Sequence, residues 1–183
     1  MRKMFLVLIT LGCFISTPGL ADQTDNRLTN LFSDLLIAAD ESDANEIEAF
    51  IWLIWVEHDD NEIRLMMDEG MYAMAAGNLH LALNIFDKVV ERKPDFAEAW
   101  NKKATVNYML RNWDQSVSDI ERTLQLEPRH FGALAGLGLI LYHQKNYHGA
   151  LHAFREVLKI YPMSDSSRRN IEVIEEQIVK QAI

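Results

Sequence analysis

Three of the four prolines in this chain, Pro94, Pro128 and Pro162, are separated by a constant interval of 34 residues. Four further sets of residues share that interval: Met66, Trp100 and Leu134; Gly70, Ala104 and Gly138; Ala82, Ser116 and Ala150; Phe86, Ile120 and Phe154. A repeat of this length is typical of a stacked array of identical supersecondary units, each of which buries its apolar face only against its neighbours. The period therefore predicts a repeat protein.

One period has the pattern of a helical hairpin. Over residues 97–126, apolar side chains recur at the spacing of an α-helix, and Arg111 and Asn112 interrupt the pattern near its middle. Asp114 is suited to cap a second helix, and Pro128 ends that helix because it cannot continue the backbone hydrogen bonding. We therefore expect two helices in each repeat and an all-α fold.

These residues resemble the tetratricopeptide repeat (TPR) family, whose pattern runs Trp-x2-Leu-Gly-x2-Tyr, then Ala-x3-Phe, then Pro. The third repeat matches best, with Leu137, Gly138, Leu141, Ala150, Phe154 and Pro162 in place. The second repeat keeps Trp100 and Pro128, whereas the first has Met66 where the family has Trp. The resemblance implies a right-handed superhelix with repeats at 63–96, 97–130 and 131–164.

Further helices are expected on both sides of the repeats. Residues 165–183 place three isoleucines on one face and predict the polar-backed helix that closes a solenoid. Apolar residues also recur at helical spacing over 28–57. We expect residues 22–62 to form an acidic helical pair, a degenerate repeat that stacks on repeat one.

The first 21 residues have the pattern of a secretory signal peptide. Two basic residues precede an apolar run over 4–15, and small residues follow up to Ala21. The run is shorter than the ~20 residues that cross a bilayer as a helix. We therefore expect a cleaved signal peptide at 1–21 and a periplasmic protein. An uncleaved anchor and a lipoprotein modified at Cys13, the only cysteine, are weaker alternatives.

The span from Trp100 to Ile140 is also similar to a group of small exported TPR proteins of Gram-negative bacteria. That similarity implies a function in the cell envelope, such as supporting its integrity or assembly, and it agrees with the expected export. It names no partner.

The acidic charge of the chain is concentrated near its start. The sequence has 18 Lys and Arg against 27 Asp and Glu, a formal charge of −9, and lacks the basic excess of a nucleic-acid-binding protein. Residues 22–62 hold twelve acids and one base, Arg27, which gives −11, the whole net charge of the chain after residue 21. These acids form either a solvated surface or a docking surface for a basic partner segment.

The resemblance also implies where a partner binds. In TPR arrays the first helix of each repeat lines the concave face through a fixed set of repeat positions. Here these positions give a groove of Met67, Met71, Met74, Asn101, Thr105, Tyr108, Met109, Leu139, Tyr142 and His143. Met is flexible and polarizable and Tyr offers a large area with a polar tip, so this groove suits an apolar or amphipathic segment.

Family members that hold a C-terminal carboxylate use Lys, Asn and Arg side chains at defined positions. The corresponding residues here are Met67, Met71, Lys102, Gly132 and Gly136. The carboxylate clamp is therefore absent, which disfavours an adaptor for the tails of chaperones.

The methionines also fit a packing interpretation. Met67, Met71 and Met74 have the i, i+4, i+7 spacing of a stripe that the N-terminal hairpin or a neighbouring subunit would cover. Under this alternative the protein is a self-associating structural protein, a homodimer with the methionine stripe as its seam.

Motifs of catalysis and metal binding do not occur. The sequence shows no Ser/His/Asp grouping, phosphate-cradling loop or nucleophile elbow, and His148 and His152 lack the glutamate of a zinc motif. We therefore expect a scaffold without enzymatic activity, cofactor or metal. Its expected partner is another envelope protein or a peptide segment, and neither a nucleic acid nor a small-molecule substrate.

Overall fold

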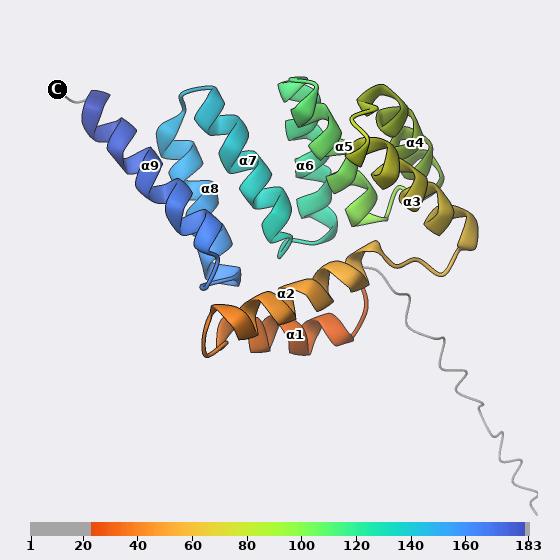
Figure 1. Cartoon of the computed structure of the whole chain (residues 1–183), viewed down its shortest axis with the longest axis horizontal. Helices are drawn as coiled ribbons and strands as arrows, with labels where there is room; N and C mark the ends of the chain where they lie inside the picture. Colours follow the sequence, from red (N-terminus) through yellow and green to blue (C-terminus); the bar gives the residue numbers. More distant parts are fainter. Residues whose placement is uncertain (1–22, 182–183) are drawn as a thin grey trace, which may run out of the picture.

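The computed structural model describes residues 23–181, which fold into helices joined by short turns, with no strand in this range (Figure 1). The expected signal peptide at 1–21 lies outside the described residues. The all-α fold is confirmed, and its helices are α1 (Arg27–Leu36), α2 (Glu41–Val56), α3 (Asn61–Ala75), α4 (Leu79–Arg92), α5 (Ala97–Met109), α6 (Trp113–Leu126), α7 (Phe131–His143), α8 (Tyr147–Ile160) and α9 (Asp165–Gln181).

The three central hairpins, α3–α4, α5–α6 and α7–α8, turn in the same way. Each turn contains one residue with positive φ, namely Gly77 at 75°, Arg111 at 62° and Lys145 at 61°. The asparagine that follows each of them donates its backbone N–H to a carbonyl five residues earlier, at 2.8 to 2.9 Å. This left-handed residue closes the end of a helix in the manner of a Schellman cap. The 34-residue period is therefore a period of backbone conformation as well as of sequence.

Small residues let the two helices of each hairpin approach. A Cβ on Gly70 would lie 2.7 Å from the ring of Phe86, and a Cβ on Gly138 would lie 2.7 Å from the ring of Phe154. In the middle repeat Ala104 faces the smaller Ile120 in the same core cluster. A larger residue in the first helix is thus matched by a smaller one in the second, which keeps the packing dense.

Helix α9 follows the third hairpin and lies against α8 (Figure 1). Ile174 is buried beside Leu151 and Phe154, and Ile171 and Ile178 pack at the edge of that cluster. The opposite face of α9 carries exposed acids, so the helix covers the apolar end of the array with a polar surface.

The N-terminal hairpin α1–α2 does not stack on the first repeat, contrary to expectation. It lies across one end of α5–α8 (Figure 1), where Leu28, Leu35 and Ile51 share a core with Phe131 and Tyr161. The hairpin therefore docks on apolar and aromatic residues of the third repeat. On α3, the side chains of Leu65 and Tyr72 are 66% and 79% exposed.

Candidate functional site

Half of the expected groove residues surround one apolar cavity between α5, α6 and α7. The cavity has a volume of about 330 Å³. Its lining includes the expected residues Asn101, Thr105, Tyr108, Met109 and Leu139, together with Ala104, Ser116, Ile120, Gly132, Ala133, Ala135 and Gly136. Gly136 of α7 leaves part of this space open, because a Cβ there would point toward Ile120 on the facing wall. We call this space the α5–α7 cavity.

One further expected residue, His143, lies beside this cavity. The hydroxyl of Tyr108 is 3.1 Å from Nε2 of His143, and the imidazole of His143 stacks on Trp113 with ring centroids 5.4 Å apart. Tyr142 instead faces Tyr147, at 5.6 Å between ring centroids, and packs among α7, α8 and α9. Tyr108 and His143 therefore form an aromatic rim, whereas Tyr142 belongs to the packing of the third repeat.

The three methionines do not line the cavity. Met67 is 0% exposed and lies in the core of the first repeat, where Ala99 and Val106 of α5 pack in the same cluster. Met71 and Met74 are half-buried against that cluster. The expected continuous groove of Met and Tyr is thus divided, and Met67 has no surface with which to bind a partner or a second copy of the chain.

A buried polar cluster that sequence analysis missed lies beneath the cavity. The carboxylate of Glu98 accepts hydrogen bonds from Nδ2 of Asn101 at 3.0 Å and from Nε2 of His130 at 2.9 Å, and it pairs with Nζ of Lys102 at 2.7 Å. Nδ1 of His130 accepts the backbone N–H of Ala133 at 3.1 Å, so the imidazole proton sits on Nε2. The amide of Asn101 is therefore engaged inside the protein.

The charge of Glu98 is sustained by its neighbours. Burial by itself raises the pKa of this carboxyl, but the Lys102 ammonium and the His130 hydrogen bond outweigh burial and hold the pKa below its usual value. The cluster is a structural element: Oε2 of Glu98 accepts both hydrogen bonds, and Oε1, which has no hydrogen-bond partner among the described residues, is held by the ion pair with Lys102. The spacing of Glu98 and Lys102, four residues apart on one helix, is the only sequence signal that pointed to it.

Two tryptophans of α2 cover this cluster from the other side. Trp55 stacks on His130 with ring centroids 4.1 Å apart and an angle of 8° between the ring planes. The ammonium of Lys102 lies 5.1 Å from the centroid of the Trp52 ring. A Cβ on Gly132 would lie 2.6 Å from the Trp52 ring, so the missing side chain makes room for this indole. The N-terminal hairpin thus packs against the Glu98 cluster and the start of α7.

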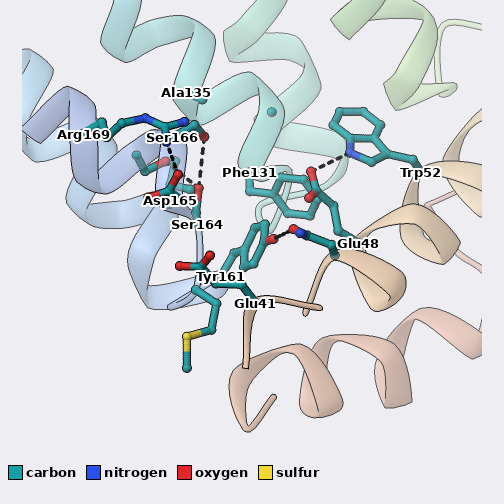
Figure 2. A pocket seen from close by; sticks show the side chains of 15 residues that line it. Glu41, Glu48, Trp52, Phe131, Ala135, Tyr161, Ser164, Asp165, Ser166 and Arg169 are labelled. Carbon is teal, nitrogen blue, oxygen red and sulfur yellow. Dashed lines mark hydrogen bonds and ion pairs between the residues drawn. The ribbon is translucent and has the colours of Figure 1, made fainter. Parts of the chain in front are cut away.

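A second cavity of about 370 Å³ lies between α2, α7, α8 and the start of α9 (Figure 2). Its walls include Trp52, Phe131 and Tyr161, and it shares Gly132 and Ala135 of α7 with the α5–α7 cavity. The hydroxyl of Tyr161 donates to Oδ1 of Asn45 at 2.8 Å. We call this space the α2–α7 cavity.

Carboxylates give the α2–α7 cavity an acidic side. Oε1 of Glu48 accepts the indole N–H of Trp52 at 3.1 Å, and Glu41 also lines the space. Burial, and then the charge of Glu48, raise the pKa of Tyr161 to about 12. Asp165 is paired with Arg169 at the opposite wall, as Figure 2 shows. The two cavities therefore differ in chemistry, one apolar and one polar.

Residues 23–181 contain no cluster of three or more His, Cys, Asp or Glu side chains suited to a metal ion. Over the same residues, no helix combines the length and the apolar character that crossing a membrane requires.

Comparison with known proteins gives a consistent result. Residues 67–118 and 108–165 match the sequence profile of the tetratricopeptide repeat. A TPR repeat-containing protein of Rhizobium etli is 36% identical over 152 residues, which cover 83% of this chain and 74% of that protein. The SGT1 homolog of Bos taurus is 37% identical over 79 residues, 43% of this chain and 23% of that protein.

Solved structures show the same fold. The Sgt2 TPR domain of Aspergillus fumigatus has a TM-score of 0.63 at 20% identity and covers 67% of this chain and 83% of its own. The first TPR domain of RPAP3 (Spaghetti), bound to an HSP90 peptide, has a TM-score of 0.63 at 15% identity and covers 66% of this chain and 96% of its own.

Proposed function

The chain belongs to the tetratricopeptide repeat family, and from this premise we propose that it is a protein-binding scaffold that holds an apolar segment of a partner at the α5–α7 cavity. The observation that supports the proposal most strongly is that cavity itself. Its lining is largely apolar and includes small residues of α7 as well as the expected residues Tyr108, Met109 and Leu139. Such a surface can exclude water from an apolar side chain that the partner inserts into the cavity.

The size of the cavity favours an anchor side chain over a whole ligand. Small-molecule sites usually have volumes of ~300–1,000 Å³, so about 330 Å³ lies at the lower end of that range. The rim can add polar contacts, because the hydroxyl of Tyr108 and the imidazole of His143 are both accessible at the mouth. An amphipathic segment with one or two apolar side chains fits this arrangement.

A chaperone tail is not the proposed partner. The RPAP3 domain of similar fold is bound to an HSP90 peptide, but this chain lacks the carboxylate clamp. Lys102, the one cation at the corresponding positions, is paired with Glu98 inside the protein. A free carboxylate would therefore find no available ammonium at that point of the concave face.

We further infer that the partner is another protein of the cell envelope. The inference rests on the signal-peptide pattern of residues 1–21. Mass spectrometry of the protein purified from periplasmic, membrane and cytoplasmic fractions tests it. A mature N-terminus near Asp22 in the periplasmic fraction is the expected result, and retention of residues 1–21 on a cytoplasmic protein would contradict it.

Photo-crosslinking in cells tests the binding site. A photoreactive residue at position 109, at the mouth of the cavity, is expected to trap a partner that the same residue at position 65 does not. Both positions carry exposed apolar side chains, but Leu65 lies on α3. Tyr108→Ala is then expected to weaken the crosslinked complex by about tenfold or more, as loss of an aromatic anchor does. Tyr72→Ala, the same change on α3, should leave the complex unchanged.

Two outcomes would overturn the proposal. Equal trapping from positions 65 and 109 would show that no defined site exists. A trapped partner that survives Tyr108→Ala unchanged would place the binding site elsewhere on the protein. Light scattering over a dilution series identifies the remaining case, in which the trapped partner is a second copy of the chain.

A further inference from the structure

The outer face of the N-terminal hairpin carries an apolar groove that the concave site does not use. The groove has a volume of about 580 Å³ and runs between α1 and α2. Ile54 is buried at its floor, while Phe50 and Leu53 are 58% and 57% exposed. Leu31 of α1 lines the facing wall. We call this space the outer groove.

Helix α2 is apolar on two opposite sides. Ile51 and Trp55 face the core that the hairpin shares with the third repeat, whereas Phe50 and Leu53 face away from it. A surface helix of a globular protein needs one apolar face, and a helix that is apolar on all sides is normally buried. The outer face of α2 therefore has the character of an interface.

Acidic side chains follow the line of the outer groove. Asp43, Glu46, Phe50, Leu53 and Glu57 recur at i, i+3 and i, i+4 spacing along α2 and its C-cap, so they share one face with acids at both ends. Across the groove, Asp34 is exposed on α1.

Of the acids along the groove, Glu57 is paired with Arg27 of the hairpin, which itself lines the groove. Arg27 is the single base among residues 22–62. Its guanidinium is paired with Asp25 at 2.8 Å and with Glu57 at 3.1 Å. The negative potential around the apolar floor is therefore left for a partner to balance.

We propose that the outer groove holds a basic amphipathic helix of a partner protein. The apolar face of that helix would lie on Phe50 and Leu53, and its Lys or Arg side chains would extend over the flanking acids. An amphipathic helix laid in an apolar groove is anchored through residues at i, i+3 and i+4, and charge complementarity would set its orientation. This proposal does not depend on the function of the α5–α7 cavity.

A second copy of this chain is a poorer occupant. Among residues 23–181, the other large apolar side chains that are more than half exposed are Leu36 and Ile37 at the end of α1, Leu65 and Tyr72 on α3, and Val179 on α9. Acids flank them as well, with Asp68 and Glu69 between the two residues of α3. Any of these faces placed in the outer groove would bring carboxylates against carboxylates, which repel one another.

A designed peptide probes the groove directly. The probe is an 18-residue fluorescein-labelled helix with Leu on one face and Lys on the other. Its controls are a scrambled peptide of the same composition and a peptide with Glu in place of Lys. Fluorescence anisotropy with the full chain is expected to show at least about tenfold tighter binding of the probe than of either control, and weaker binding as salt is raised.

Paired variants locate the site. Phe50→Ser and Leu53→Ser are each expected to weaken binding of the probe by about tenfold or more, whereas Leu65→Ser leaves it unchanged. The double variant Asp43→Asn/Glu46→Gln should reduce the salt dependence. Its control, Asp68→Asn/Glu69→Gln on α3, makes the same chemical changes at exposed positions. Circular dichroism checks that every variant is folded.

Several results would overturn the proposal. They are equal binding of the scrambled peptide, unchanged binding to Phe50→Ser, or equal losses in the control variants. A dimer in light scattering that Phe50→Ser dissociates would assign the groove to a second copy of the chain. Tyr108→Ala must leave binding of the probe unchanged, so failure at this groove is distinguishable from failure at the α5–α7 cavity.

Discussion

Glu98 is a buried carboxylate that links α5 to the turn before α7 and supports the contact with the N-terminal hairpin. Its carboxylate accepts hydrogen bonds from Asn101 of the same helix and from His130 in the turn before α7. It also forms an ion pair with Lys102. The stacked ring of Trp55 then covers His130. Removal of one member of such a buried set leaves the others without a partner, which costs far more than the set contributes when it is intact.

The first prediction concerns this carboxylate. Glu98→Gln is expected to lower the free energy of unfolding by about 2–4 kcal/mol, because Lys102 loses its counter-charge and one donor loses its acceptor. Glu69→Gln on the exposed side of α3 should change it by less than about 0.5 kcal/mol. Urea denaturation followed by circular dichroism measures both variants. A Glu98→Gln protein as stable as the Glu69→Gln control would show that the charge of Glu98 is not needed.

The second prediction uses the raised pKa of Tyr161. Since this pKa is about 12 in the folded chain and 10.0 for an ordinary tyrosine, the unfolded chain loses the phenolic proton first as pH rises. The contribution of Tyr161 to stability is therefore fully present below pH 10.0 and is lost between pH 10.0 and about 12. Tyr161→Phe should make stability less dependent on pH in that window. An ultraviolet absorbance titration in which all tyrosines ionise together near pH 10 would contradict it.

At the scale of the element, the turns show how far the sequence predicts local structure. In the sequence, the interruption at Arg111 and Asn112 indicated a turn. The sequence did not indicate that Arg111 and Lys145 would adopt a left-handed backbone conformation. Only the first repeat has glycine, Gly77, at that position. The repeat register forces the other two residues into a conformation that costs an ordinary residue roughly 1 kcal/mol.

Two Gly→Ala changes are expected to have opposite signs. Gly77→Ala should destabilise the chain by about 1 kcal/mol, because φ is 75° and open space around the position offers no new contact. Gly136→Ala should stabilise it by up to about 1 kcal/mol, because alanine is the better helix former and its Cβ would meet Ile120 at an ordinary 3.5 Å. Thermal unfolding measures both, and destabilisation by Gly136→Ala would show that α7 tolerates no side chain there.

The position of the N-terminal hairpin marks the limit of prediction from sequence. The helices α1 and α2 followed from apolar spacing and a capping pattern, whereas their docking depends on contacts between residues far apart in the chain. Trp55 stacks on His130, and the guanidinium of Arg129 lies 4.2 Å from the ring centroid of Phe32. No local pattern encodes such pairs, so the expected stacking on repeat one was wrong.

Across the whole molecule, the candidate site was predicted where the repeat positions are regular. Tyr108, Met109 and Leu139 lie at the cavity because the second and third repeats share one register. Met67 of the first repeat corresponds to Asn101 and Ala135, which also line the cavity, but it is covered by α5. Glu98, His130 and Trp52 were missed because their roles arise from packing between separate units.

The hairpin changes how the whole array should unfold. A solenoid normally has interactions only between neighbouring repeats, so its ends fray separately. Here α1 and α2 contact α5, α7 and α8, which ties the start of the chain to its third repeat. Such contacts between distant segments favour a single cooperative transition over stepwise loss of repeats.

The last prediction tests this coupling at Trp55. Because its buried ring packs on His130 and Phe32, Trp55→Ala should cost about 3–5 kcal/mol and should lower hydrogen-exchange protection in α5 and α7 as well as in α2. Trp55→Phe keeps an aromatic ring and removes an indole N–H without a hydrogen-bond partner among the described residues, so it should cost less than half as much. Lost protection confined to α1 and α2 in Trp55→Ala would mean that the hairpin is an independent unit.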